Sequence, residues 1–250
     1  MHEIPHCLYS SPIIWHLPLR LGCVRIKKDR EVDAVLEKMA DFFEARLAGY
    51  DEHMLENIDG AWEFYPFTAS LLPCKVGSRV LDLGCGTGLE LEEYFRLCPT
   101  ARVTGMDLSR GMLAALREKF PEKRMTLLCG SYFDLPLGED CFDAAVSVES
   151  LHHFTAEEKL PLYRKVREAL VPGGVFVLTD YFALSEEEER FRREELLRLK
   201  REQGLGDEAF YHYDTPLTAA HETEILRLAG FSAVEVLRSW GATHTLRAVR

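Results

Sequence analysis

The chain has 250 residues, of which 47% are hydrophobic and 28% are charged, and its formal net charge is −11. This composition is that of an ordinary globular protein and excludes disorder of the whole chain. An acidic chain repels a phosphate backbone, so nucleic acid is not an expected partner.

Residues 1–28 are predicted to form an irregular extension, because three prolines interrupt them and no signal-peptide pattern is present. A membrane span needs a run of about 18 apolar residues, and the sequence contains no such run, so no span is predicted. The seven cysteines are odd in number, and no two have Cys-x-x-Cys spacing. Free thiols in a reducing compartment are the simplest interpretation, which predicts a cytoplasmic location.

Residues 29–75 are predicted to form a helical cap. Apolar residues from Val32 to Leu47 recur at helical spacing and predict one amphipathic helix. A second apolar segment runs from Ala61 to Leu72 and ends at Pro73. An apolar stripe needs a surface to pack on, so both segments are expected to lie against a core domain at residues 76–250.

From Arg79 onward, short β-rich runs alternate with helical segments, which is typical of parallel βαβ units. The predicted strands are 79–83, 102–107, 125–129, 142–148, 174–180, 232–238 and 243–249. The predicted helices lie near 88–97, 110–119, 157–170, 186–203 and 219–229. The short turn at Trp240 and Gly241 forces the last two strands to run antiparallel. The expected fold is α/β, with a doubly wound, Rossmann-like, mostly parallel sheet, an antiparallel C-terminal strand and a helical insertion at about 185–215.

The most informative stretch runs from Arg79 to Gly88, where a strand passes through a glycine-rich turn into a helix. Gly84 and Gly86 permit positive φ and let a ligand approach the backbone, at the sheet edge where doubly wound folds bind ligands. Asp107 follows the next strand, at the spacing of an acid that binds ribose hydroxyls. Asp82 places a carboxylate beside the ligand, which disfavours a pyrophosphate and favours an ammonium or sulfonium group.

These residues resemble a known family. Residues 80–88 are similar to motif I of the class I S-adenosylmethionine (SAM)-dependent methyltransferases, and the resemblance continues in the family's order through 105–109, 142–147 and 170–174. It implies SAM as the cofactor and S-adenosylhomocysteine as the product, with the methionine part near Gly84 and Gly86 and the ribose at Asp107. The other cofactor contacts that it implies are Asp82, Cys85, Leu108, Met112, Ser131, Tyr132 and Ser147.

Two positions qualify this resemblance. Ser131 stands where many relatives have an aspartate that binds the adenine amino group, so backbone near Tyr132 and apolar contact from Leu108 are expected to take a larger share. The segment around Tyr50 and Asp51 resembles the region before motif I in small-molecule methyltransferases such as the quinone C-methyltransferases. That likeness makes Tyr50 a candidate lid residue, and a core tyrosine is the alternative.

Methyl transfer from SAM needs an aligned acceptor and a dry pocket, with a general base only where the acceptor is still protonated. The candidates after the fourth strand are Glu149, His152 and His153. The alternative for His153 is packing against the cofactor or capping the helix that begins after Thr155. No metal site is predicted, because third and fourth ligands are not evident near the two histidines.

Aromatic residues with polar tips are predicted to wall the acceptor pocket, and ordinary core packing is the alternative for each of them. The candidates are Tyr65, Tyr181, Tyr211 and His212. The resemblance implies methyl transfer to a small-molecule acceptor that the sequence does not identify. Two other functions stay open, namely a SAM-binding regulator or scaffold without turnover, and an NAD-dependent oxidoreductase, which the glycine spacing disfavours.

Overall fold

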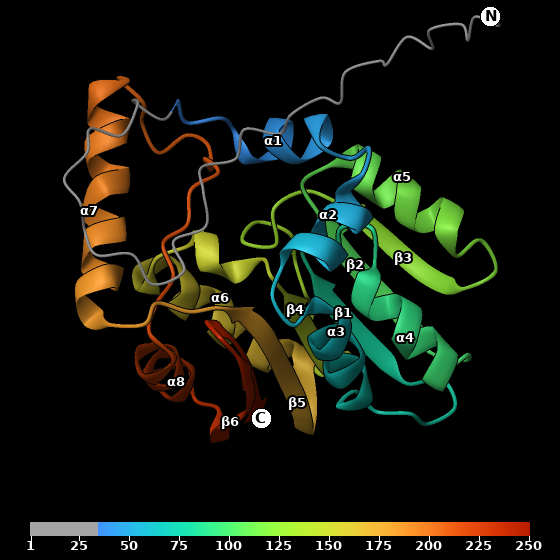
Figure 1. Ribbon diagram of the computed structural model, residues 1–250. Helices are drawn as coiled ribbons and strands as arrows, with labels where there is room; N and C mark the ends of the chain where they lie inside the picture. Colours follow the sequence, from blue (N-terminus) through green and yellow to red (C-terminus); the bar gives the residue numbers. More distant parts are fainter. Residues whose placement is uncertain (1–34) are drawn as a thin grey trace, which may run out of the picture. The chain divides into compact units, whose positions relative to one another are not determined.

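A computed structural model describes residues 35–250, so the predictions for the extension at 1–28 and for residues 29–34 lie outside the described residues. One seven-stranded sheet in the order β3-β2-β1-β4-β5-β7-β6 is flanked by helices (Figure 1). Its strands are β1 (Arg79–Leu83), β2 (Arg102–Asp107), β3 (Arg124–Cys129), β4 (Phe142–Val148), β5 (Leu170–Tyr181), β6 (Ser232–Trp240) and β7 (Thr243–Val249). The helices are α1 (Met39–Ala45), α2 (Tyr50–Asn57), α3 (Ala61–Ser70), α4 (Leu89–Leu97), α5 (Arg110–Lys119), the 3-10 turn η1 (Leu151–His153), α6 (Ala156–Ala169), α7 (Glu186–Glu202) and α8 (Ala219–Leu228).

The sheet topology confirms the predicted fold class. Strands β1 to β5 pair in parallel, and β7 pairs antiparallel with both β5 and β6. Parallel strands joined by helices end at the same edge, so the segments after β1, β2, β4 and β5 meet there. The residues predicted to carry chemistry follow these strands, and the topology therefore brings them together.

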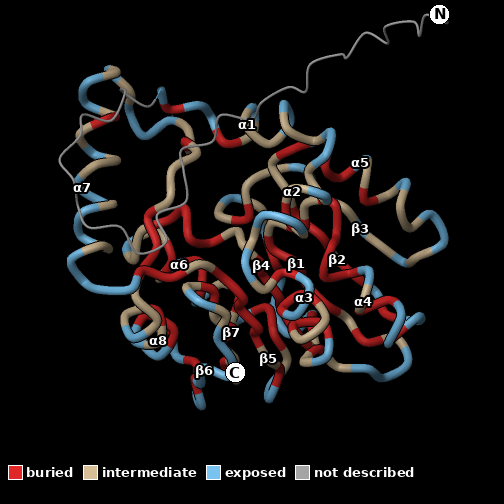
Figure 2. The backbone as a smooth tube through the Cα atoms, viewed as in Figure 1, coloured by how far each residue is buried: buried red, intermediate tan, exposed pale blue. Residues whose placement is uncertain are grey.

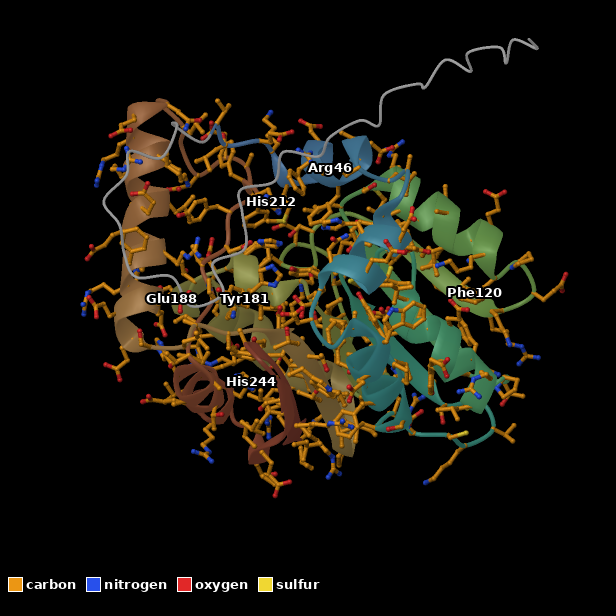
Figure 3. All side chains as sticks on the ribbon, viewed as in Figure 1. Arg46, Phe120, Tyr181, Glu188, His212 and His244 are labelled. Carbon is orange, nitrogen blue, oxygen red and sulfur yellow. The ribbon has the colours of Figure 1, made fainter. Side chains whose placement is uncertain are left out.

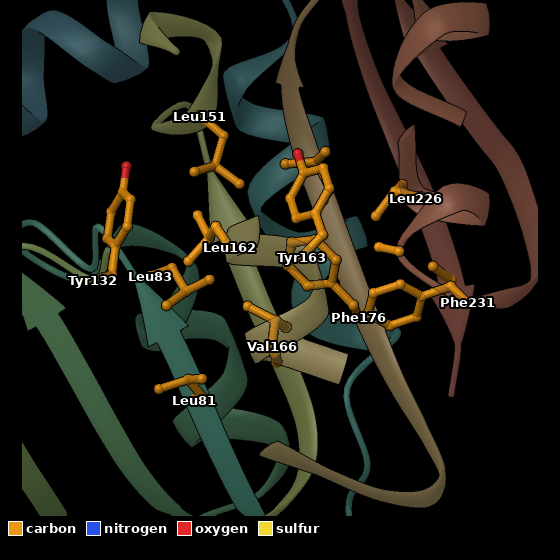
Figure 4. Close-up of a cluster of buried hydrophobic side chains, with 14 of the residues drawn as sticks. Leu81, Leu83, Tyr132, Leu151, Leu162, Tyr163, Val166, Phe176, Leu226 and Phe231 are labelled. Atoms are coloured by element: carbon orange, nitrogen blue, oxygen red, sulfur yellow. The ribbon is translucent and has the colours of Figure 1, made fainter. Parts of the chain in front are cut away.

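Two apolar layers hold the helices to the sheet, and the buried backbone runs through its centre (Figure 2). Side chains alternate along a strand, so Leu81 and Leu83 face α6, where they join Leu162 and Val166 (Figure 4). Val80 faces the opposite way and joins a second cluster with residues of α3, α4 and α5. Asp82 shares the orientation of Val80, so its carboxylate points toward the α4 side of the sheet.

The cap differs from the prediction of one helix across Val32 to Leu47. Within the described part of that stretch the helix begins only at Met39 and ends at Ala45, and Val35 is 78% exposed. Gly49 adopts a positive φ of 81° and separates α1 from α2, which the apolar spacing alone did not reveal. Leu36 instead packs with Leu199 of α7.

Residues 35–250 form one compact unit, and α1 to α3 belong to it. The predicted boundary between a cap at 29–75 and a core at 76–250 stays a prediction. Among the described helices, none combines the length and the apolar character needed to cross a membrane.

Candidate functional site

The glycine-rich loop after β1 is fastened to β2 by its own backbone. The amides of Gly84 and Cys85 both donate to the carbonyl of Met106, at 2.9 and 3.1 Å. The Asp107 carboxylate accepts from the amide of Gly86 at 2.9 Å and from that of Ser109 at 2.8 Å. Each of its oxygens keeps a further lone pair, so Asp107 holds the loop while it can still accept hydroxyl groups of a ligand.

A pair of buried acids lies behind this loop. Asp82 is 1% exposed and Glu90 of α4 is 5% exposed. Both oxygens of Asp82 and one of Glu90 receive no hydrogen bond from a donor within the described chain, and the two carboxyl groups can bond to each other only if one carries a proton. Burial and the neighbouring Glu90 raise the pKa of Asp82, and burial also raises the pKa of Glu90. Two such groups favour a cation beside them.

Tight contacts explain the glycines of the loop. A β-carbon on Gly84, whose φ is +75°, would lie 2.1 Å from the hydroxyl oxygen of Ser150, so the backbone passes close to the segment after β4. That hydroxyl lies 3.3 Å from the hydroxyl of Tyr132. A β-carbon on Gly86 would lie 3.9 Å from the ring of Tyr50. The predicted lid residue Tyr50 therefore lies over the glycine loop.

The helices before β1 reach the same loop through two acids. Glu44 of α1 accepts from the Ser109 hydroxyl at 2.6 Å and from the amide of Gly111 at 3.0 Å, at the start of α5. Asp51 of α2 accepts from the hydroxyl of Thr87 and pairs with Lys119 at 2.6 Å. These contacts fix α1 and α2 over the carboxyl edge of β1 and β2, and single-sequence patterns gave no sign of Glu44.

Of the remaining predicted cofactor residues, two are apolar and at least half-buried, and two are serines that bond to the backbone. Met112 is buried on α5, and Leu108 is half-buried. The hydroxyl of Ser131 accepts from the amide of Phe133 at 3.1 Å and so caps its own turn. The hydroxyl of Ser147 donates to the carbonyl of Leu83 at 3.0 Å, deep in the sheet. Ser147 therefore ties β4 to β1.

A second group of polar side chains follows β4 and includes all three predicted catalytic residues. Glu149 has a positive φ of 48°, a strained conformation for a residue with a side chain. Nδ1 of His152 lies 2.5 Å from the Asp180 carboxylate, which also accepts from the amide of Leu151. His153 and Asp214 come next, 3.2 Å apart between Nδ1 and the carboxylate.

Burial and charge compete in this cluster, which contains the carboxyl groups of Glu149, Asp180 and Asp214. Burial lowers the pKa of His152, but the Asp180 carboxylate outweighs it and raises that pKa to about 9. Burial and the nearby His152 lower the pKa of His153. Burial and Asp180 raise the pKa of Glu149 to about 8. The raised pKa values of His152 and Glu149 mean that these two groups keep their protons more readily beside the neighbouring carboxylates.

Two of the four predicted pocket aromatics lie beside these groups. The ring of Tyr181 lies 6.0 Å from that of His152, and the ring of His212 lies 4.9 Å from that of His153. Figure 3 shows Tyr181 beside Glu188 of α7 and His212 on the side of α1. Tyr65 is buried on α3, where burial and the charge of Tyr50 raise its pKa.

The surroundings of Tyr211 differ from those of Tyr181 and His212. Tyr211 is 8% exposed and packs with Leu36 and Leu199 in an apolar cluster separate from the histidines. Its backbone forms a bridge with Lys38, which ties the segment before α8 to the segment before α1. The alternative of ordinary core packing therefore describes Tyr211 better.

Two open cavities lie at the opposite, amino edge of the strands. One of about 380 Å³ is lined by residues that include Arg79, Arg102 and Arg124. The other, of about 520 Å³, is lined by residues that include Lys75 and Arg247. Neither includes a residue of the glycine loop or the histidine cluster, so neither is the candidate site.

The sequence is similar to those of known methyltransferases. Residues 80–174 match the family model of a methyltransferase domain. An uncharacterised methyltransferase of Geobacillus sp. is 29% identical over 206 residues, 81% of this chain and 91% of that protein. A probable tRNA methyltransferase 9B of Mus musculus is 28% identical over 49% of this chain and 26% of its own length.

Solved structures share the fold. A phosphoethanolamine N-methyltransferase 2 from Haemonchus contortus, solved with SAM, superposes with a TM-score of 0.64 at 18% identity, over 84% of this chain and 59% of that one. The chain thus spans about three fifths of this structural relative and nearly all of the Geobacillus protein.

Proposed function

This chain belongs to the class I SAM-dependent methyltransferases, and we propose that it transfers the methyl group of SAM to a small-molecule acceptor held beside the histidine cluster. The observation that carries the proposal is that two different sites lie at the same edge of the sheet. The first is a glycine loop backed by the partnerless carboxylate of Asp82, and the second is the group of Glu149, His152 and His153. The methyltransferase match favours SAM over the NAD-dependent alternative.

The residues of the loop fit SAM. Asp107 keeps free lone pairs for the ribose hydroxyls. At Gly86, where an added β-carbon would meet only the Tyr50 ring at 3.9 Å, the backbone leaves room for the methionine part. The buried carboxylate of Asp82 gains a partner when a positively charged ligand lies beside it. When bound, SAM supplies a methyl group on a sulfonium centre that leaves as a neutral thioether. Tyr50 covers the loop and helps to exclude water.

The acceptor side supplies polar groups within a largely buried setting. His152 and His153 are 9% and 7% exposed, whereas the Asp214 side chain is 41% exposed and marks the open side of the cluster. Such a site suits a compact acceptor with an oxygen, nitrogen or sulfur atom that must lose a proton. The net charge of −11 and the acidic residues among the arginines of α7 argue against a nucleic-acid acceptor.

Calorimetric titration with SAM tests the cofactor site. We expect binding by the native chain, and we expect Asp107→Asn to weaken it by about 1–3 kcal/mol, because charge-assisted hydrogen bonds to the ribose are lost. The exposed Glu122→Gln serves as a control of equal charge change. Equal affinity of Asp107→Asn and the native chain would remove Asp107 from the site.

A second measurement separates turnover from binding alone. Cell extract divided into a fraction below about 3 kDa and a tRNA fraction is incubated with enzyme and SAM, and S-adenosylhomocysteine is quantified. We expect product with the small-molecule fraction only. Product with tRNA alone would reassign the acceptor, and SAM binding without product from any fraction would favour a regulator or scaffold.

A further inference from the structure

The histidine cluster has an arrangement that acid–base chemistry does not require. Nε2 of His152 lies 3.6 Å from the Asp214 carboxylate, and Nδ1 of His153 lies 3.2 Å from the same oxygen. All three donor atoms lie within 4.8 Å of one another. Two imidazoles and one carboxylate from two distant segments of the chain therefore lie together, and Nδ1 of His153 also lies 3.3 Å from the carbonyl oxygen of Tyr213.

These spacings suit one metal ion. Zinc binds imidazole nitrogen and carboxylate oxygen at about 2.0–2.2 Å, which puts neighbouring ligand atoms of a tetrahedron about 3.3 Å apart. The observed 3.2 and 3.6 Å bracket that value. The two histidine nitrogens lie within 4.8 Å of each other, so a small cation can bind once the imidazoles adjust toward it.

The surroundings orient the ligands as metal sites do. Nδ1 of His152 lies 2.5 Å from Asp180, so the opposite nitrogen, Nε2, is the one directed at Asp214. Asp180 is itself 2% exposed and is fixed by the amides of Leu151 and Tyr181, at 2.8 and 2.9 Å. A histidine ligand whose second nitrogen bonds to an anchored carboxylate is a common supporting contact in metal sites.

The charge balance also calls for a cation. Three carboxyl groups, from Glu149, Asp180 and Asp214, lie around His152, at 3.9, 2.5 and 3.6 Å. The positive groups that face them are Lys159 behind Asp180 and Arg192 of α7 near Asp214. Lys159 already pairs with Glu222 at 2.6 Å. A divalent cation would offset the carboxylates without the uptake of protons.

We propose that His152, His153 and Asp214 bind one divalent transition-metal ion, such as Zn²⁺, and leave its fourth position open. This role rests on the proposed function, in that the open position takes an oxygen or thiol of the acceptor. A bound cation lowers the pKa of a coordinated hydroxyl and so prepares it to attack the methyl group. The proton leaves to solvent on the exposed side of Asp214, and no oxidation or reduction is involved.

Metal content and visible spectra test the site directly. Untagged full-length protein is stripped with chelator, equilibrated with Zn²⁺ or Co²⁺ and dialysed, and bound metal is measured by mass spectrometry. We expect one metal per chain and, with Co²⁺, the intense visible absorption of a tetrahedral complex. A metal content below about one tenth per chain would overturn the proposal.

Variants assign the ligands. We expect His153→Ala and Asp214→Asn to weaken metal binding at least tenfold, and Asp180→Asn to weaken it about 10–100-fold as a supporting group. His53→Gln on α2, which lies outside the cluster, is the matched control and should bind as the native chain does. Asp214→Asn is the clearest test, because a side chain that is 41% exposed can be changed without unfolding the chain, so weaker metal binding then reports the lost ligand. Equal affinity of Asp214→Asn and the control would overturn the ligand set.

The failure of this proposal is distinguishable from that of the proposed function. SAM titration of the metal-free chain should give the same affinity as the metal-loaded chain, because the cofactor site shares no ligand with the cluster. Turnover should fall at least tenfold after chelation and return with Zn²⁺ or Co²⁺. Full turnover by the metal-free chain would overturn the role of the metal in holding the acceptor, whatever the affinity for SAM.

Discussion

At the scale of single residues, the sequence placed the cofactor side better than the acceptor side. Asp82 and Asp107 could be predicted because each sits at a fixed distance from a glycine-rich turn that only a strand-to-helix connection uses. Asp214 could not be assigned to His152, because the 61 positions between them give no pairing signal. The link is made by the backbone, where the Thr215 amide donates to the His152 carbonyl at 2.8 Å.

Asp82 leads to a prediction in which stability and binding change in opposite directions. Burial raises the pKa of this carboxyl in the folded chain, so its ionised form costs stability as the pH rises above the unfolded value. We expect Asp82→Asn to raise the melting temperature of the cofactor-free protein at pH 7–8 by about 2–4 °C, the equivalent of about 1 kcal/mol. The gain should shrink as the pH falls through the unfolded value of 3.8, below which Asp82 is protonated in both states.

The same substitution removes the negative charge that the proposed site offers to SAM. We therefore expect Asp82→Asn to bind SAM at least tenfold more weakly, measured by calorimetry on the same samples. Glu122→Gln changes the charge equally at an exposed position and should alter neither quantity. A less stable Asp82→Asn variant at neutral pH would show that the carboxylate already has a partner in the cofactor-free protein.

At the scale of helices and strands, the core was predictable because β-rich runs and capping residues mark their own ends. The capping box of Thr155 and Glu158 opens α6 as expected, and Ser185 caps α7. β5 is longer than predicted, since Leu170 already pairs with Phe142, ahead of a shift in register between Phe142 and Ala144. The prediction of one helix from Val32 to Leu47 was wrong, because packing on the core, rather than apolar spacing, decides where α1 begins.

A buried ion pair connects two helices on the α6 face of the sheet. Nζ of Lys159 on α6 lies 2.6 Å from Glu222 on α8, both are at most 1% exposed, and Tyr163 donates to the same carboxylate. We expect Lys159→Met to lower the free energy of unfolding by about 3–5 kcal/mol, because it leaves Glu222 charged and buried. Urea denaturation with an unchanged m-value measures this loss.

The double variant shows whether the pair or its burial matters. Lys159→Met with Glu222→Leu removes both charges, and we expect it to recover most of the lost stability, since a buried pair is often replaceable by apolar residues. The recovery will be incomplete to the extent that Tyr163 loses its acceptor. A double variant as unstable as the single one would mean that the pair, rather than the unpaired charge, supplies the stability.

At the scale of the whole molecule, the cofactor site joins parts of the chain that are far apart in sequence. Glu44 and Asp51 precede the sheet, and they contact residues of the loops and helices after β1 and β2. A ligand that fills this site must therefore stabilise the described unit as a whole rather than one loop.

Thermal unfolding measures that coupling. A ligand that binds only the folded chain adds about 2.7 kcal/mol when its concentration is 100 times its dissociation constant. For a chain of this size, each kcal/mol raises the melting temperature by about 2–4 °C, so SAM should raise it by about 5–11 °C. NADH should produce no shift, because the buried Asp82 carboxylate opposes a pyrophosphate. Bulk tRNA at 0.15 M salt should also produce none, since the chain carries a net charge of −11. A shift with tRNA equal to that with SAM would mean that a local basic surface outweighs the net charge, and the acceptor would then have to be sought among RNAs.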